Sequence, residues 1–128
     1  MPIKYKAVSQ AQPGVKGGGS YSYYARICDR ENMSIYELCD QISDMSTFSR
    51  GDVIGVVETL LDIIPTQLKR GKNISLGNFG TFSLSISSEA VETANQLTSR
   101  NIKKTNIQFR PGVMFKKEVS MAKFIKVK

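Results

Sequence analysis

The chain has 128 residues, of which 41% are hydrophobic, and a formal net charge of +7 at pH 7. This length suits one domain, 1–128, that can bury a core but gains stability from a second copy. No apolar run approaches the roughly 18 residues of a membrane span, no secretory signal is visible, and histidine is absent. We therefore expect no membrane association, no enzyme activity, no cofactor or metal and no small-molecule substrate.

The charges are segregated along the sequence. Residues 1–28 have four basic residues and no acid, while residues 29–68 have eight acids against Arg30 and Arg50. Residues 69–128 have twelve basic residues against three acids. A basic half of this kind is typical of a protein that binds a polyanion. The two cysteines, Cys28 and Cys39, have no metal-binding spacing and are predicted to be free thiols.

The N-terminal segment 1–28 is predicted to add two strands to the domain. Residues 2–8 alternate between apolar and basic side chains, which indicates a short strand with a charged face. Residues 10–20 contain Pro13 and three consecutive glycines, so we expect a flexible loop there. The aromatic stretch 21–27 is predicted to pair with the first strand. The end of the chain, 121–128, contains a further strand candidate at 124–127 that could also pair with residues 2–8.

Two helices are predicted next, each with a serine at its N-cap. Ser34 with Glu37 fits a capping box, and Ser49 with Asp52 has the same spacing at the start of the second helix. The second helix is apolar on more than one side, so it must be covered on more than one side. In a chain this short, a partner subunit is the natural cover. Pro65 should kink or break that helix near its last turn.

A hairpin follows the helices and organises the rest of the chain. Gly71 ends the second helix, residues 73–76 and 81–87 alternate as strands, and Gly77 and Gly80 bracket the turn between them. Segment 88–104 follows, in which residues 93–98 could form a helical turn or a long loop. A third strand is predicted at 105–110, ended by Pro111, and a short basic helix at 113–121.

The motifs in this order resemble a known family. Leu76-Gly77-Asn78-Phe79-Gly80-Thr81-Phe82, followed by Phe109-Arg110-Pro111-Gly112 and Lys116-Lys117, is similar to the bacterial histone-like HU and integration host factor proteins. The resemblance covers 34–120. It is strongest to an HU-related branch with an N-terminal strand extension, through Ser87 to Thr93 and Asn101 to Lys103.

The resemblance implies an α+β fold in an intertwined homodimer, with a helical base and a β-saddle over duplex DNA. It implies a cytoplasmic, nucleoid-associated protein that binds and condenses DNA with little sequence preference. Family members extend β-arms with a proline at each tip that wedges between base pairs. Here 88–104 has no proline, and Ser83, Ser85 and Ser87 stand where arginines are frequent.

From the residues and the resemblance together we predict two sets. The candidate DNA-binding residues, which contact the phosphate backbone and minor groove, are polar or basic: Lys69, Arg70, Lys72, Ser83, Ser85, Ser87, Arg100, Lys103, Lys104, Gln108, Arg110, Lys116 and Lys117. The candidate dimer-core residues are apolar: Val53, Val57, Leu60, Leu61, Ile64, Phe79, Phe82 and Phe109.

One other class of function remains open. The missing arm proline and the cluster Tyr21, Tyr23 and Tyr24 also fit an HU-fold structural or protein-interaction module with weak or no DNA binding. Binding of single-stranded nucleic acid or RNA is compatible with the same basic and aromatic residues.

Overall fold

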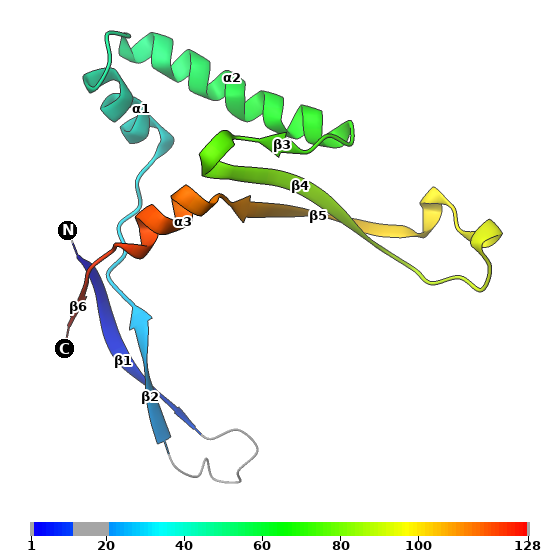
Figure 1. The fold of residues 1–128 in the computed structure, drawn as a ribbon, viewed down its shortest axis with the longest axis horizontal. Helices are drawn as coiled ribbons and strands as arrows, with labels where there is room; N and C mark the ends of the chain where they lie inside the picture. The colour runs from blue at the N-terminus through cyan, green and yellow to red at the C-terminus, as the bar shows by residue number, and fades with distance from the viewer. Residues whose placement is uncertain (1, 12–20, 128) are drawn as a thin grey trace. The chain divides into compact units, whose positions relative to one another are not determined.

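The structure is a computed structural model that describes residues 2–11 and 21–127. The chain divides into two compact units (Figure 1): Met1–Ser34 together with Val119–Lys128, and Ile35–Glu118. The flexible loop expected at 10–20 lies outside the described residues from residue 12 to residue 20. Its first two residues are part of a strand instead.

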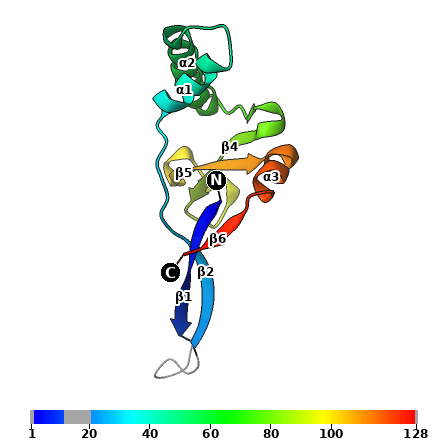
Figure 2. The same ribbon diagram turned by 90° about the vertical axis from the view of Figure 1, so that its left-hand side faces the viewer.

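The first unit is built on a three-stranded sheet in the order β2-β1-β6 (Figure 2). Strand β1 (Ile3–Ala11) pairs antiparallel with β2 (Tyr21–Ile27) and parallel with β6 (Phe124–Lys126). The Ile3 amide donates to the Lys123 carbonyl at 2.7 Å, and the Val127 amide donates to the Tyr5 carbonyl at 2.9 Å. Both predicted pairings of the first strand are therefore confirmed.

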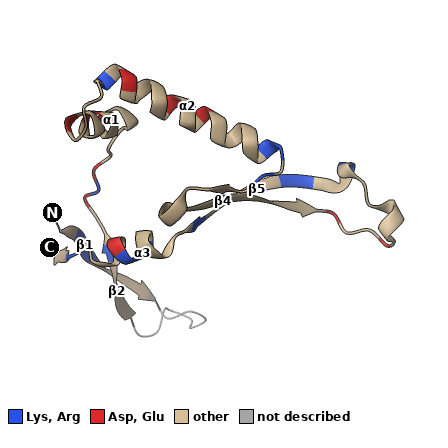
Figure 3. Ribbon diagram, turned by 45° about the horizontal axis from the view of Figure 1, so that its top comes forward, with Lys and Arg blue, Asp and Glu red and all other residues tan. Residues whose placement is uncertain are grey.

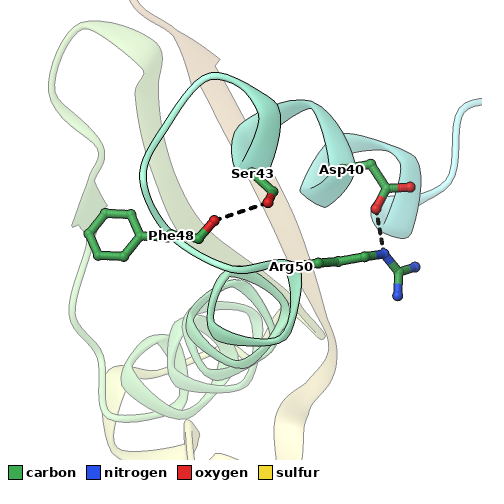
Figure 4. Close-up of polar contacts among 4 residues, drawn as sticks. All are labelled: Asp40, Ser43, Phe48 and Arg50. Atoms are coloured by element: carbon green, nitrogen blue, oxygen red, sulfur yellow. Dashed lines mark hydrogen bonds and ion pairs between the residues drawn. The ribbon is translucent and has the colours of Figure 1, made fainter.

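The second unit begins with the helices α1 (Ile35–Asp44) and α2 (Arg50–Lys69), as predicted. Ser49 caps α2, because its hydroxyl accepts from the Asp52 amide at 3.2 Å. The turn between the helices is closed by the Ser43 hydroxyl, which donates to the Phe48 carbonyl at 3.0 Å, and by an ion pair between Arg50 and Asp40 (Figure 4).

The prediction that Pro65 could break α2 is wrong. The helix continues through Pro65 for four more residues and ends at Lys69. Proline removes only one amide donor here, and the flanking turn keeps its own bonds. In this turn the Thr66 hydroxyl also donates a hydrogen bond to the Asp62 carbonyl at 3.1 Å. The helix therefore reaches its basic end without interruption.

The second sheet has the order β3-β4-β5. Its strands are β3 (Ile74–Ser75), β4 (Gly80–Ser88) and β5 (Ile102–Pro111), and the turn expected at Gly77 and Gly80 contains the 3₁₀ turn η2 (Gly77–Phe79). Strand β5 begins three residues before its predicted start. The segment between β4 and β5 has two short 3₁₀ turns, η3 (Ala94–Gln96) and η4 (Ser99–Asn101). Helix α3 (Val113–Ser120) follows β5.

Four phenylalanines form the centre of the hairpin region. The Phe82 and Phe109 ring centroids lie 4.7 Å apart, and Phe79 meets Phe115 of α3 edge-on at 4.6 Å. Aromatic pairs at these distances add attraction beyond the area they bury. Phe79 and Phe82 thus contribute to an aromatic cluster in the hairpin region, and Phe79 remains 46% exposed. Buried apolar side chains in the described residues are few: Cys39, Val53 and Leu68.

Gly80 is expected to be intolerant of any side chain. It has a φ of +151°, and an added Cβ would lie 2.6 Å from the Arg110 carbonyl oxygen and 2.6 Å from the Phe109 ring. Backbone strain and overpacking together should make Gly80→Ala less stable by about 2–4 kcal/mol.

The measurement is the free energy of unfolding in urea. Gly71→Ala is the matched control, because Gly71 also has positive φ, +81°, but open space around its Cβ position. Conformational strain alone should cost that variant about 1 kcal/mol. Equal losses in the two variants would contradict the steric argument.

Candidate nucleic-acid interface

One face of the β4–β5 ladder is polar along its whole length. Residues directly opposite each other in an antiparallel pair project to the same face. The register places Ser83 opposite Gln108, Ser85 opposite Asn106, and Ser87 opposite Lys104. Thr81 opposite Arg110 continues this face toward the turn. The structure therefore brings six of the predicted DNA-binding residues onto one surface: Ser83, Ser85, Ser87, Lys104, Gln108 and Arg110.

This polar face contains no negative charge, since neither β4 nor β5 has an aspartate or glutamate. The serines are half-buried, and the Asn106 amide donates to the Ser87 hydroxyl at 3.2 Å. Lys104, Gln108 and Arg110 are exposed beside them. Small hydroxyls and amides permit close approach of another backbone, and the two cations can pair with phosphate oxygens.

Lys103 and Arg100 lie beyond the polar face, toward the tip of the hairpin. The register shifts between Ser87 and Ser88, which leaves Lys103 as the extra residue of a bulge. A bulge redirects the side chain it contains. Arg100 lies in η4, where the Thr98 amide donates to the Asn101 side chain at 2.9 Å and fixes the turn. The sequence has no periodic signal that predicts either feature.

Three more predicted residues gather at the C-terminal end of α2. Lys69 is the last residue of the helix, Arg70 is its C-cap, and Lys72 follows Gly71. Cations are favoured there because the last carbonyls of a helix are partly negative. Figure 3 shows this basic end of α2 and the acidic residues along the rest of both helices. Those acids are Glu37, Asp40, Asp44, Asp52, Glu58 and Asp62.

Lys116 and Lys117 belong to α3 and are not part of the polar face. The Lys116 amide donates to the Gly112 carbonyl at 3.0 Å in the first turn of this helix, and Phe115 packs against Phe79. These contacts hold α3 against the hairpin turn. Both lysines are exposed.

Comparison with known proteins identifies the family. A sequence profile described as "HU domain fused to wHTH, Ig, or Glycine-rich motif", named HU-HIG, matches residues 1–126. The chain belongs to the HU-HIG family. The motifs that carry the resemblance lie in 34–120, and the profile extends beyond them at both ends. No curated protein matches the chain.

A solved structure supports the fold. It is the crystal structure of a candidate bacterial DNA-binding protein from Bacteroides vulgatus, at 9% sequence identity and a TM-score of 0.65. The match covers 98% of this chain and 48% of that chain, so the HU-HIG chain spans about half the length of its structural relative.

The HU-HIG chain leaves much of its predicted dimer core uncovered. Val53 is buried within the chain, and Val57, Ile64 and Phe82 are half-buried. The others are more open: Leu60 is 45% exposed, Leu61 49%, Phe79 46% and Phe109 36%. The apolar face of the β4–β5 ladder is also open at Ile86 and Ile107.

The open face of α2 is larger than the sequence analysis predicted. Val56 is 71% exposed and Ile63 is 48% exposed, and both line a groove of about 810 Å³ with Phe48, Gly55 and Leu60. The spacing of Val56, Leu60 and Ile63 places them on one side of the helix. That spacing could have identified them, but the apolar residues of α2 are too numerous to assign each to a face without the position of α1.

The described residues offer no site for a metal ion, because none of their His, Cys, Asp and Glu side chains form a group of three or more that could bind one. None of the helices in the described part of the chain is long and apolar enough to cross a bilayer. Cys28 and Cys39 are free thiols, as predicted.

Proposed function

We propose that this chain is a non-enzymatic, nucleoid-associated DNA-binding protein. It binds duplex DNA with little sequence preference, through the polar face of β4 and β5. The observation that carries the proposal is the acid-free face on which the register aligns Lys104 and Arg110 with a column of small hydroxyls. Such a surface pairs with phosphates and reads few base edges.

The description of the structural relative as a candidate DNA-binding protein supports this proposal, as does membership of a family named for its HU domain. Helices α1 and α2 contain six acidic residues, whereas strands β4 and β5 contain none. DNA is therefore expected on the sheet side of each subunit and repelled from its helical base. The cellular location that follows is the cytoplasmic nucleoid.

We further propose that the binding unit is an intertwined homodimer with a saddle made from two hairpins. The described residues include only three buried apolar side chains, which are too few for a unit with an amphipathic helix pair to be stable alone. A second copy that covers Val56, Leu60 and Ile63 supplies the missing burial. In this arrangement 1–128 acts as one DNA-binding domain, with 34–120 as its HU-like core and 1–28 and 121–128 as added strands.

Segment 88–104 contains no proline, so this protein has no proline wedge between β4 and β5. We propose that it binds DNA without kinking it by proline intercalation. Contacts from Lys103 and Arg100 then extend the phosphate-binding surface toward the hairpin tip. DNA condensation would follow from neutralised phosphates more than from sharp bends.

A salt titration of duplex binding tests the proposal. Each phosphate contact contributes about 0.9 to the slope of log affinity against log salt, and a dimer making six to ten contacts should lose about 10³–10⁵ in affinity between 50 and 200 mM salt. Fluorescence anisotropy with several unrelated duplexes measures both the slope and the sequence preference.

Absence of binding at about 50 mM salt would reject DNA as the ligand. The protein-interaction module would then be the better interpretation. Tighter binding to single strands or to RNA than to duplex DNA would change the class of nucleic acid.

A further inference from the structure

The three-stranded sheet of the first unit has two chemically different faces. The register places Lys6 directly opposite Arg26 and Val8 opposite Tyr24. Since side chains alternate along a strand, Lys4 shares the face of Lys6 and Arg26. The other face has Tyr5, Ala25 and Ile27, together with Phe124 and Lys126 of β6. We call the face with Lys4, Lys6 and Arg26 the basic sheet face.

Two cations directly opposite each other on neighbouring strands repel each other. A nearby carboxylate would normally relieve this repulsion, but β1 and β2 contain no acid. Arg50 and Asp40 form an ion pair, but it lies in the other unit. Asp29 and Glu31 follow β2 and line a pocket with Lys4, which stands two residues before Lys6 on β1. Among the described residues, no ion pair with a carboxylate is found for Lys6 or Arg26.

A hollow lies beside Arg26, and four of the six residues that line it, Val8, Gln10, Tyr24 and Arg26, share the basic sheet face by the strand register. It has a volume of about 410 Å³ and is lined by residues of the two paired strands: Val8, Ser9, Gln10, Tyr24, Ala25 and Arg26. Tyr24 is 57% exposed, so its ring forms an accessible wall of the hollow. Three of the lining residues, Arg26, Tyr24 and Gln10, have side-chain donors that can hydrogen-bond phosphate oxygens.

We propose that the basic sheet face is a second DNA-binding surface, which contacts the phosphate backbone through Lys6 and Arg26, with Lys4 beside them. The inference rests on the proposed function, because the polyanion is the same duplex DNA. A phosphate between Lys6 and Arg26 converts a repulsive cross-strand pair into two charge-assisted hydrogen bonds. The N-terminal extension then enlarges the DNA-binding surface of each subunit.

The test compares variants of the full chain in the anisotropy titration. K6Q/R26Q should bind duplex DNA about tenfold more weakly at low salt and lower the salt slope by about two units for each subunit that contacts the DNA. Lys126→Gln is the control, because Lys126 is an exposed lysine of the same sheet on the other face. It should leave affinity and slope unchanged. The melting temperature of K6Q/R26Q should equal or exceed that of the wild type, because a repulsive pair is removed.

The outcomes separate this inference from the proposed function. If the wild type binds no DNA, the proposed function fails and this inference with it. If K6Q/R26Q binds like the wild type while neutralisation of Lys104 and Arg110 weakens binding, only the basic sheet face is rejected. An equal loss in Lys126→Gln and K6Q/R26Q would also reject it, since net charge would then explain the effect.

Discussion

Replacing Lys104 and Arg110 together by glutamine is expected to lower the affinity for duplex DNA by about a hundredfold and to reduce the salt slope by about two units for each subunit that contacts the DNA. Both side chains are exposed on the polar face of β4 and β5, at opposite ends of the hydroxyl column. Their removal takes away charge without touching the apolar face, so the fold should remain intact.

Arg50→Gln is the matched control for that experiment. Arg50 is a cation of the same unit, but it lies at the start of α2 among the acids of the helical pair and is already paired with Asp40. An exposed ion pair of this kind contributes little to stability. Affinity should therefore stay within about twofold of the wild type.

A loss of affinity in both variants would indicate a general effect of net charge. Unchanged affinity in K104Q/R110Q, with circular dichroism showing a folded protein, would contradict the proposed interface. Anisotropy and a salt series on the same duplex decide between these results.

The sequence predicted the hairpin and its polar face because two simple patterns coincide there. Serines occupy alternate positions of 83–87, and polar residues occupy alternate positions of 106–110. Because alternate side chains of a strand point to the same side, each strand is predicted to have one polar face. The paired register then brings the two columns together, as it does for Ser85 and Asn106. A period of two, with glycines at the turn, is sufficient information for this part of the site.

Other features depend on tertiary structure that no local pattern encodes. The bulge at Lys103 moves this lysine out of the ladder, and the polar run from Lys103 to Asn106 has no alternation that could indicate it. The helix continues through Pro65 because an isolated missing hydrogen bond near a helix end is tolerated within a 20-residue helix. The basic sheet face could not be predicted from the sequence for a similar reason. Lys6 lies opposite Arg26 only in one register of β1 and β2, and the two strands are far apart in the sequence.

Val56→Asp is expected to have the largest effect on the fold and assembly. In an isolated subunit, Val56 is 71% exposed, and a surface substitution there should change stability by no more than about 0.5 kcal/mol. In a homodimer that covers the α2 groove, the same change buries an unpaired carboxylate beside Leu60 and Ile63. That should cost about 3–5 kcal/mol and dissociate or unfold the dimer at micromolar concentration.

Val113→Asp is the control for the same change of side chain. Val113 is 81% exposed and begins α3, where an acid is favoured by the amides of the first helical turn. Sedimentation equilibrium and circular dichroism should show this variant as a folded dimer and Val56→Asp as a monomer or an unfolded chain.

A wild type that sediments as a stable monomer would contradict the homodimer. A dimeric Val56→Asp would place the subunit interface elsewhere than on the α2 groove. If the homodimer is correct, Val56→Asp also loses duplex binding although Lys104 and Arg110 are intact, because a saddle needs the hairpins of two subunits. Loss of assembly together with loss of binding would link the apolar helix face to the DNA-binding surface.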